Sequence, residues 1–243
     1  MSENLNKLLF FHIETAGITS SLSELENKYP LLHDSWENNV IHYIRKWFTE
    51  DDKLSSEEVF VKRAAGIPEF AKIICVSAAF LQTDNTPKVE TWCDLGENPL
   101  DEKEIITKFR GIVEKVDNLG FKLCGHEIKS FTIPCIAKRM LINGLKPPKI
   151  FPNHETKPWE IRAIDTKDVW GFASGRGLYS LGVISSAMGI KTDDHHDSQW
   201  ERSDAHKLYW GKGDLFRKKE IKERCEKNLL EVMRLMLKIN LLK

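Results

Sequence analysis

The sequence has no excess of charge of either sign. Lys plus Arg and Asp plus Glu each count 36 among 243 residues, so the formal net charge at pH 7 is zero. A strongly basic chain would indicate binding to nucleic acid or to an anionic membrane through its overall charge. That mode of binding is excluded, and a polyanion would have to meet a local patch of positive charge.

Cysteines are few, and long apolar runs are missing. The five cysteines are odd in number and show neither the paired spacing of a metal site nor a disulfide framework, which is typical of a reducing compartment. No apolar run approaches the roughly 20 residues of a membrane-spanning helix, and the N-terminus lacks a basic segment followed by an apolar one. We therefore expect a soluble, cytoplasmic protein with no membrane partner.

The pattern of apolar residues predicts an α/β fold. Five apolar segments, rich in β-branched or alternating residues, predict strands, and a polar turn joins the second and third into a hairpin. These segments are 8–17, 71–83, 88–95, 121–127 and 159–170. Helical periodicity predicts helices at 101–116, 132–145, 180–190 and 218–242. Strands and helices in this order predict a mixed sheet flanked by helices.

The segment that follows the first strand has a different composition. It is polar, with helix-like spacing of apolar residues from Trp36 to Trp47, and it ends in the charged run 49–58, which we expect to be a surface connection. We predict a helical insertion around 18–60 within one domain that spans 1–243.

Two polar side chains close the apolar run of the first strand. Because side chains alternate along a strand, His12 and Glu14 share one face while Phe11 and Ile13 share the other. Ligand sites in α/β folds lie near strand ends, so this pair and the loop after Cys124 are the first places to look for a site. The alternative is that His12 and Glu14 simply face solvent.

Several segments together resemble one family. They are FFHIETAG, GIPEFAKIICVSAAF, LCGHEIKSFTIPCIAKRMLINGL, AIDTKDVWGF, SLGVISSAMGI and RCEKNLLEVMRL. In this order they resemble the motifs of the DEDD 3′-5′ exonucleases, in particular the group related to the proofreading domain of family B DNA polymerases. The resemblance covers most of the chain. It implies a ribonuclease H-like mixed five-stranded sheet flanked by helices.

The resemblance also implies where the chemistry would lie. In that family four carboxylates hold two Mg²⁺ or Mn²⁺ ions, which activate water for phosphodiester hydrolysis. Here the four positions are His12, Glu14, Thr132 and Asn228, and the position of the general base is Arg224. Only Glu14 is an acid, and it is the one weak candidate for a metal ligand. Since Mg²⁺ needs hard oxygen ligands, we predict a degenerate site without a metal cofactor, in which Arg224 pairs with Glu14.

Two other interpretations stay open. An atypical but active exonuclease would use Mg²⁺ or Mn²⁺ and would need a second carboxylate, for which Glu127, Asp165 and Asp168 are the candidates. A site for one transition metal ion would combine His12 and Glu14 with a neighbouring His126 or Glu127.

A protein that has lost hydrolysis could still bind single-stranded nucleic acid, and a protein partner is the other possibility. The candidate nucleic-acid contacts are Thr15, His126, Glu127, Phe131 and Arg176. For Glu127 an ordinary exposed loop acid is the simpler interpretation. The cluster DDHHD, Asp193 to Asp197, is interpreted as a solvated loop rather than a metal site.

Overall fold

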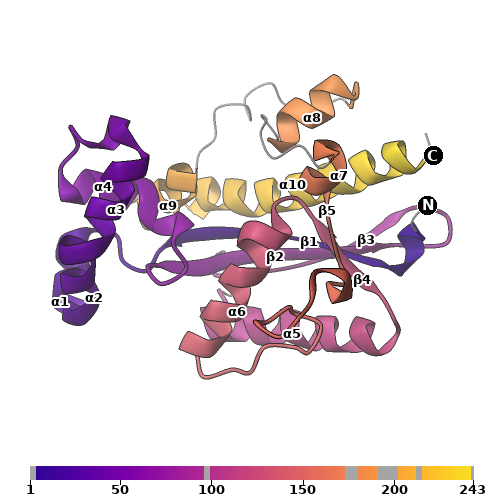
Figure 1. The fold of residues 1–243 in the computed structure, drawn as a ribbon, viewed down its shortest axis with the longest axis horizontal. Coiled ribbons are helices and arrows are strands. Elements are labelled where there is room, and N and C mark those ends of the chain that lie inside the picture. The colour runs from indigo at the N-terminus through magenta and orange to yellow at the C-terminus, as the bar shows by residue number, and fades with distance from the viewer. Residues whose placement is uncertain (1–3, 96–98, 173–179, 191–201, 212–214, 242–243) are drawn as a thin grey trace.

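A mixed five-stranded sheet forms the centre of the computed structural model, which describes residues 4–95, 99–172, 180–190, 202–211 and 215–241 (Figure 1). The strand order is β3-β2-β1-β4-β5. The bounds are β1 Leu8–Gly17, β2 Ala71–Leu81, β3 Pro87–Cys93, β4 Lys122–Gly125 and β5 Ala163–Asp165. β2 pairs antiparallel with β1 and β3, whereas β4 pairs parallel with β1 and β5. The predicted mixed sheet and the β2–β3 hairpin are confirmed.

Helices α5 (Glu102–Asn118) and α6 (Ile133–Ile142) cover one face of the sheet (Figure 1). Asp101 begins α5 with a capping box, in which Asp101 and Glu104 each accept the other's backbone N–H. Phe109 of α5 packs against Phe11 of β1 with ring centroids 5.2 Å apart. Five apolar side chains of α5 are buried: Ile105, Ile106, Phe109, Val113 and Val116. This face is a continuous apolar core.

The long C-terminal helix α10 (Leu215–Leu241) covers the other face, with α7 (Thr166–Gly171) and α8 (Leu181–Ala187) beside it (Figure 1). Its buried side chains Leu229, Val232, Met233 and Met236 pack against Phe10 and other residues of the sheet. The apolar side chains of this predicted helix are therefore part of the core. Helix α9 (Arg202–Trp210) packs against β1 and α10.

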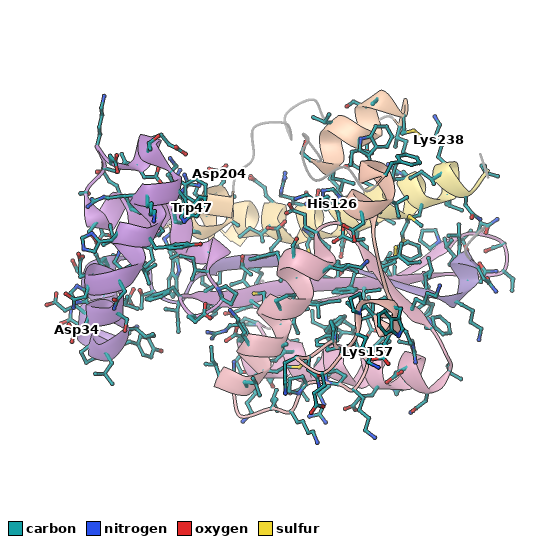
Figure 2. All side chains as sticks on the ribbon, viewed as in Figure 1. Asp34, Trp47, His126, Lys157, Asp204 and Lys238 are labelled. Atoms are coloured by element: carbon teal, nitrogen blue, oxygen red, sulfur yellow. The ribbon has the colours of Figure 1, made fainter. Side chains whose placement is uncertain are left out.

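Helices fill the segment between β1 and β2: α1 Leu22–Lys28, α2 Pro30–Ser35, α3 Ile41–Trp47 and α4 Ser56–Arg63. Figure 1 shows them at one end of the sheet. Trp36, in the π-helical turn Trp36–Val40, is fully buried in the apolar cluster of this segment, whereas Trp47 is 65% exposed and projects from α3 (Figure 2).

Residues 49–58 are mostly exposed, as expected of a surface connection, but Asp51 is an exception. Asp51 is fully buried and accepts hydrogen bonds at 2.6 Å from both Lys62 and Arg63. α4 begins inside the run, where Ser55 and Glu58 form a capping box. Charge in the sequence did not indicate exposure here because the buried carboxylate has two cationic partners, which offset its desolvation.

One predicted strand matches the structure and another does not. β1 spans the predicted segment 8–17 and so continues past His12 and Glu14, while its neighbour β4 pairs only with Leu8 to Phe10. The predicted strand at 159–170 is only three residues long, because Asp165 accepts the Lys167 N–H and so begins α7. The site therefore lies beside the middle of β1, beyond the end of β4.

The chain turns sharply after β4. A Cβ at Gly125 would collide with Ile128 Cγ2 and would lie 2.9 Å from the Phe11 carbonyl oxygen, so only glycine fits at this position. Glu127 then adopts a left-handed conformation with φ of 54°, and the π-helical turn Ile128–Thr132 leads into α6. This turn carries His126, Glu127, Phe131 and Thr132 past the side of β1.

Candidate functional site

A cavity of about 240 Å³ opens between β1, the turn after β4 and α10. It contains the five positions expected to carry chemistry and four of the candidate nucleic-acid contacts. The lining residues are His12, Ile13, Glu14, Thr15, His126, Glu127, Phe131, Thr132, Arg224 and Asn228. Arg176 and the cluster 193–197 lie outside the described residues.

Glu14 is held by side chains from its own strand and from α10. It is only 7% exposed, and its Oε1 lies 3.8 Å from Arg224 Nε and 3.4 Å from His12 Nε2. Asn228, one helical turn beyond Arg224, places its Nδ2 3.2 Å from the same His12 nitrogen. The ion pair predicted between Arg224 and Glu14 is present, and four of the expected positions form one connected polar group.

Glu127 is not the ordinary exposed loop acid that we expected. Its side chain is half-buried at the cavity, and its Oε1 accepts a hydrogen bond from Lys167 Nζ at 2.7 Å. Its backbone N–H donates to Asp165 Oδ1 at 2.9 Å. Sequence reasoning missed Lys167, because the pair joins segments that meet only when β4 lies beside β5.

The other two candidate acids lie away from the cavity lining. Asp165, 2% exposed, accepts hydrogen bonds from the backbone N–H groups of Glu127, Lys129 and Lys167 at 2.9, 3.1 and 3.0 Å. Asp168 is exposed and pairs with Lys129 at 2.9 Å. Asp165 thus fixes the backbone turn that carries Glu127, and neither acid reaches the site.

His126 and Thr15, two of the candidate nucleic-acid contacts, each have a polar partner within the chain. The Nδ1 of His126, which is labelled in Figure 2, lies 2.8 Å from Thr166 Oγ1. Burial lowers the pKa of His126, although Glu127 and Asp165 nearby oppose this effect. Thr15 donates its hydroxyl hydrogen to the Ala65 carbonyl at 2.8 Å, so a ligand in the cavity would meet that hydroxyl only as an acceptor.

Comparison with known proteins places the chain in a family. The family model described as "Predicted 3'-5' exonuclease related to the exonuclease domain of PolB" matches residues 67–243, more than half of the chain. The chain belongs to this exonuclease family. The matched region contains Thr132, Arg224 and Asn228, whereas β1 with His12 and Glu14 precedes it.

A solved structure supports the fold of this exonuclease-family chain. The family B DNA polymerase of the hyperthermophilic archaeon Pyrobaculum calidifontis matches over 96% of the chain with a TM-score of 0.51 and 13% sequence identity. The match covers 24% of the polymerase. At this identity the likeness concerns the fold alone, which is the expected ribonuclease H-like architecture. No curated protein matches the chain, and no helix among the described residues is long and apolar enough to cross a membrane.

Few groups in the described lining of the cavity are of the kind that binds Mg²⁺. Mg²⁺ is bound through carboxylates and other hard oxygen ligands. The described lining of the cavity offers two carboxylates, Glu14 and Glu127, and each is paired with a cation, Arg224 and Lys167 respectively. Among the described residues, His, Cys, Asp and Glu side chains form no group of three or more that could hold a metal ion. The single-ion arrangement of His12, Glu14 and His126 or Glu127 is therefore not formed.

Proposed function

We propose that the chain is a pseudo-exonuclease, which binds single-stranded nucleic acid in the cavity beside β1 without hydrolysing it. Membership of an exonuclease family supports nucleic acid as the partner. The observation that carries the proposal is that both carboxylates of the described cavity lining are neutralised by cations of the chain itself.

The cation beside Glu14 opposes metal binding by electrostatics. Arg224 lies on the side of Glu14 that faces α10, and a divalent ion bound to the carboxylate would lie a few ångströms from its guanidinium. Repulsion between such charges is strong where water is partly excluded. The remaining positions offer an imidazole, a hydroxyl and an amide from His12, Thr132 and Asn228, which carry no charge to compensate Mg²⁺ for lost water.

The same groups suit a strand that is bound but not cleaved. Because each acid has a cationic partner, the cavity repels a phosphate less than two unpaired carboxylates would. Phe131 lines the cavity and offers a ring on which a base can stack. His126 and Asn228 supply polar atoms beside it. Loss of hydrolysis is therefore compatible with retained binding.

One observation favours the alternative, an atypical but active metal-dependent exonuclease. Glu14 and Glu127 line the same cavity, so two carboxylates face one space. That arrangement could serve metal chemistry only if both ion pairs, with Arg224 and with Lys167, were to separate.

The two functions are separated by a time course with end-labelled single-stranded DNA and RNA in Mg²⁺ or Mn²⁺, together with fluorescence anisotropy of the same strands. The protein, Glu14→Ala and the control Glu90→Gln, which changes an exposed acid on β3, are compared. We expect binding without degradation. Degradation that disappears in Glu14→Ala but persists in Glu90→Gln would overturn the proposal in favour of the active enzyme. Neither binding nor degradation would also overturn it and would direct the search to protein partners.

The assignment of the four positions has its own test. The combined variant His12→Asp, Thr132→Asp, Asn228→Asp and Arg224→Tyr restores the acids and removes the cation. If the backbone has kept the geometry of the family, we expect Mn²⁺-dependent release of labelled nucleotides that the parent lacks. No gain in a variant with an unchanged circular dichroism spectrum would contradict the assignment.

A further inference from the structure

Three cysteines lie between α10 and the sheet: Cys225 on α10, Cys75 on β2 and Cys93 on β3. β2 is the strand next to β1, which lines the cavity. Cys75 on β2 pairs in register with Cys93 on β3, and the thiols of Cys93 and of Cys225 on α10 are close enough to shift the pKa of Cys75. Cys75 and Cys225 are buried and Cys93 is half-buried. The thiols do not belong to a group of described side chains that could hold a metal ion. Their proximity therefore points to thiol chemistry rather than to metal binding.

Two of the thiols lie directly opposite each other on neighbouring strands. Cys75 pairs in register with Cys93. The Asp94 N–H donates to the Ile74 carbonyl at 2.8 Å, so Ile74 and Asp94 form the hydrogen-bonded position and Cys75 with Cys93 the adjacent non-hydrogen-bonded one. At such positions the Cα atoms are about 4.5 Å apart, within the range of roughly 4.4–6.8 Å that disulfides span. A bond between these sulfurs needs no shift of register.

The two sulfurs differ in reactivity. The hydrogen bond from Cys75 lowers the pKa of Cys93 to about 7, and the nearby Lys222 adds to this, whereas burial and Glu226 oppose it. Hydrogen bonds to Cys225 and Cys93, together with burial, raise the pKa of Cys75 well above its usual value. The thiolate is the nucleophilic form of cysteine. Cys93 is therefore the attacking thiol and Cys75 the neighbour that resolves the product.

We propose that Cys75 and Cys93 are a site of oxidative modification, where a peroxide forms a disulfide between β2 and β3. The Cys93 thiolate attacks one peroxide oxygen, the O–O bond breaks, and Cys93 becomes a sulfenic acid as hydroxide leaves. The Cys75 sulfur then attacks the Cys93 sulfur, the S–O bond breaks, and the hydroxyl group leaves as water with the Cys75 proton. In sum, two thiols and one hydrogen peroxide give one disulfide and two water molecules.

The Cys75–Cys93 pair lies next to the strand that lines the cavity. Cys75 pairs in register with Glu14, and Cys225 Sγ lies 3.6 Å from the His12 carbonyl oxygen, to which it donates. Cys225 is also the residue after Arg224. A disulfide at Cys75 would therefore form next to the backbone that carries Glu14. The inference does not depend on the proposed function, because it concerns the thiols alone.

Peptide mapping of the full chain tests the proposal. The protein is treated with hydrogen peroxide, remaining thiols are alkylated, and a non-reducing tryptic digest is analysed by mass spectrometry. Trypsin cuts after Lys88, between Cys75 and Cys93, and after Arg224, before Cys225, so each possible bond gives a different linked peptide. We expect the Cys75–Cys93 peptide to dominate and to disappear with dithiothreitol. It should persist in Cys225→Ala and in the control Cys135→Ala, and be absent in Cys93→Ser.

A kinetic measurement covers the case in which a variant fails to fold. In the unmodified protein at pH 7, iodoacetamide should alkylate Cys93 about tenfold faster than Cys135, whose side chain is fully buried. Equal rates would overturn the assignment of Cys93 as the attacking thiol. A dominant Cys75–Cys225 peptide, or a Cys93 oxidised to sulfinic acid without any linked peptide, would overturn the proposed disulfide.

Discussion

The two faces of β1 differ in composition: one packs into the apolar core, and the other presents polar side chains to the cavity. Toward α5 the strand presents Leu9, Phe11 and Ile13, all buried in one apolar core. Toward α10 it presents Phe10 in an apolar cluster and then His12 and Glu14 in the cavity. One face is held by burial of apolar surface, which is favourable without directional partners. The other keeps buried polar groups, which are tolerated only with partners.

The comparison shows that scaffold and site are separable within one strand. Substitutions toward α5 should change the stability of the fold, while those toward α10 should change what the cavity binds.

The largest effect is expected from Phe109→Ala on the α5 side. Phe109 is fully buried against Phe11, and its truncation leaves a cavity, so the free energy of unfolding should fall by about 3–5 kcal/mol. Guanidinium denaturation measures this. The control Leu119→Ala, at a 63% exposed position after α5, should change the free energy by less than about 0.5 kcal/mol. Similar losses in both variants would contradict the role of this face as the main core.

Asp165→Ala comes next, because it removes the acceptor of three backbone N–H groups beneath the cavity turn. Leaving such donors unsatisfied should lower the free energy of unfolding by about 2–3 kcal/mol. Asp168→Ala is the matched control, since that carboxylate is exposed and bonded only to the Lys129 side chain in the described structure. Urea denaturation of both variants measures the free energy of unfolding. An Asp165→Ala variant as stable as Asp168→Ala would contradict the prediction and would mean that water replaces the carboxylate.

A smaller effect is expected on the α10 side from Arg224→Met. It leaves Glu14 buried without its cation, which should cost about 1–3 kcal/mol of unfolding free energy, less than the about 3–5 kcal/mol of a close buried pair because the two groups are 3.8 Å apart. Adding Glu14→Gln removes the stranded charge and should restore part of the loss. A double-mutant cycle measured by thermal unfolding gives the coupling between the two residues. Strict additivity would show that the 3.8 Å pair contributes nothing.

The smallest effect is a pH dependence at the end of β1. His206 of α9 accepts the Gly17 N–H at its Nδ1 and lies beside the Ser20 carbonyl, and burial lowers its pKa. The unfolded chain therefore binds a proton more readily than the folded one. Stability should be complete above about pH 6.5 and should fall as the pH drops below that value. Thermal unfolding from pH 7.5 to 5 measures this, and His206→Gln should flatten the curve of stability against pH. An unchanged slope in the variant would assign the dependence to another group, such as His126, whose pKa is also lowered.

Much of the fold could be predicted because it depends on local patterns. The apolar run of β1, the turn of the β2–β3 hairpin and the helical periodicity of α5 and α10 each lie within one segment. The Glu14–Arg224 pair was also predicted, but through the family resemblance, which supplied the relative placement of β1 and α10. Asp51 shows the limit, since its charge predicted exposure and its two cationic partners allow burial.

The sequence by itself determined most of the strands, the helices α5 and α10 and the apolar face of β1. Only the tertiary structure decided that Lys167 neutralises Glu127, that Asp165 fixes the turn, and that Cys75, Cys93 and Cys225 meet. The physical reason is that these contacts join residues far apart in the sequence. A periodic pattern reports which side of its own element a residue faces, whereas these contacts join elements whose relative position is set by packing of the whole sheet and its helices.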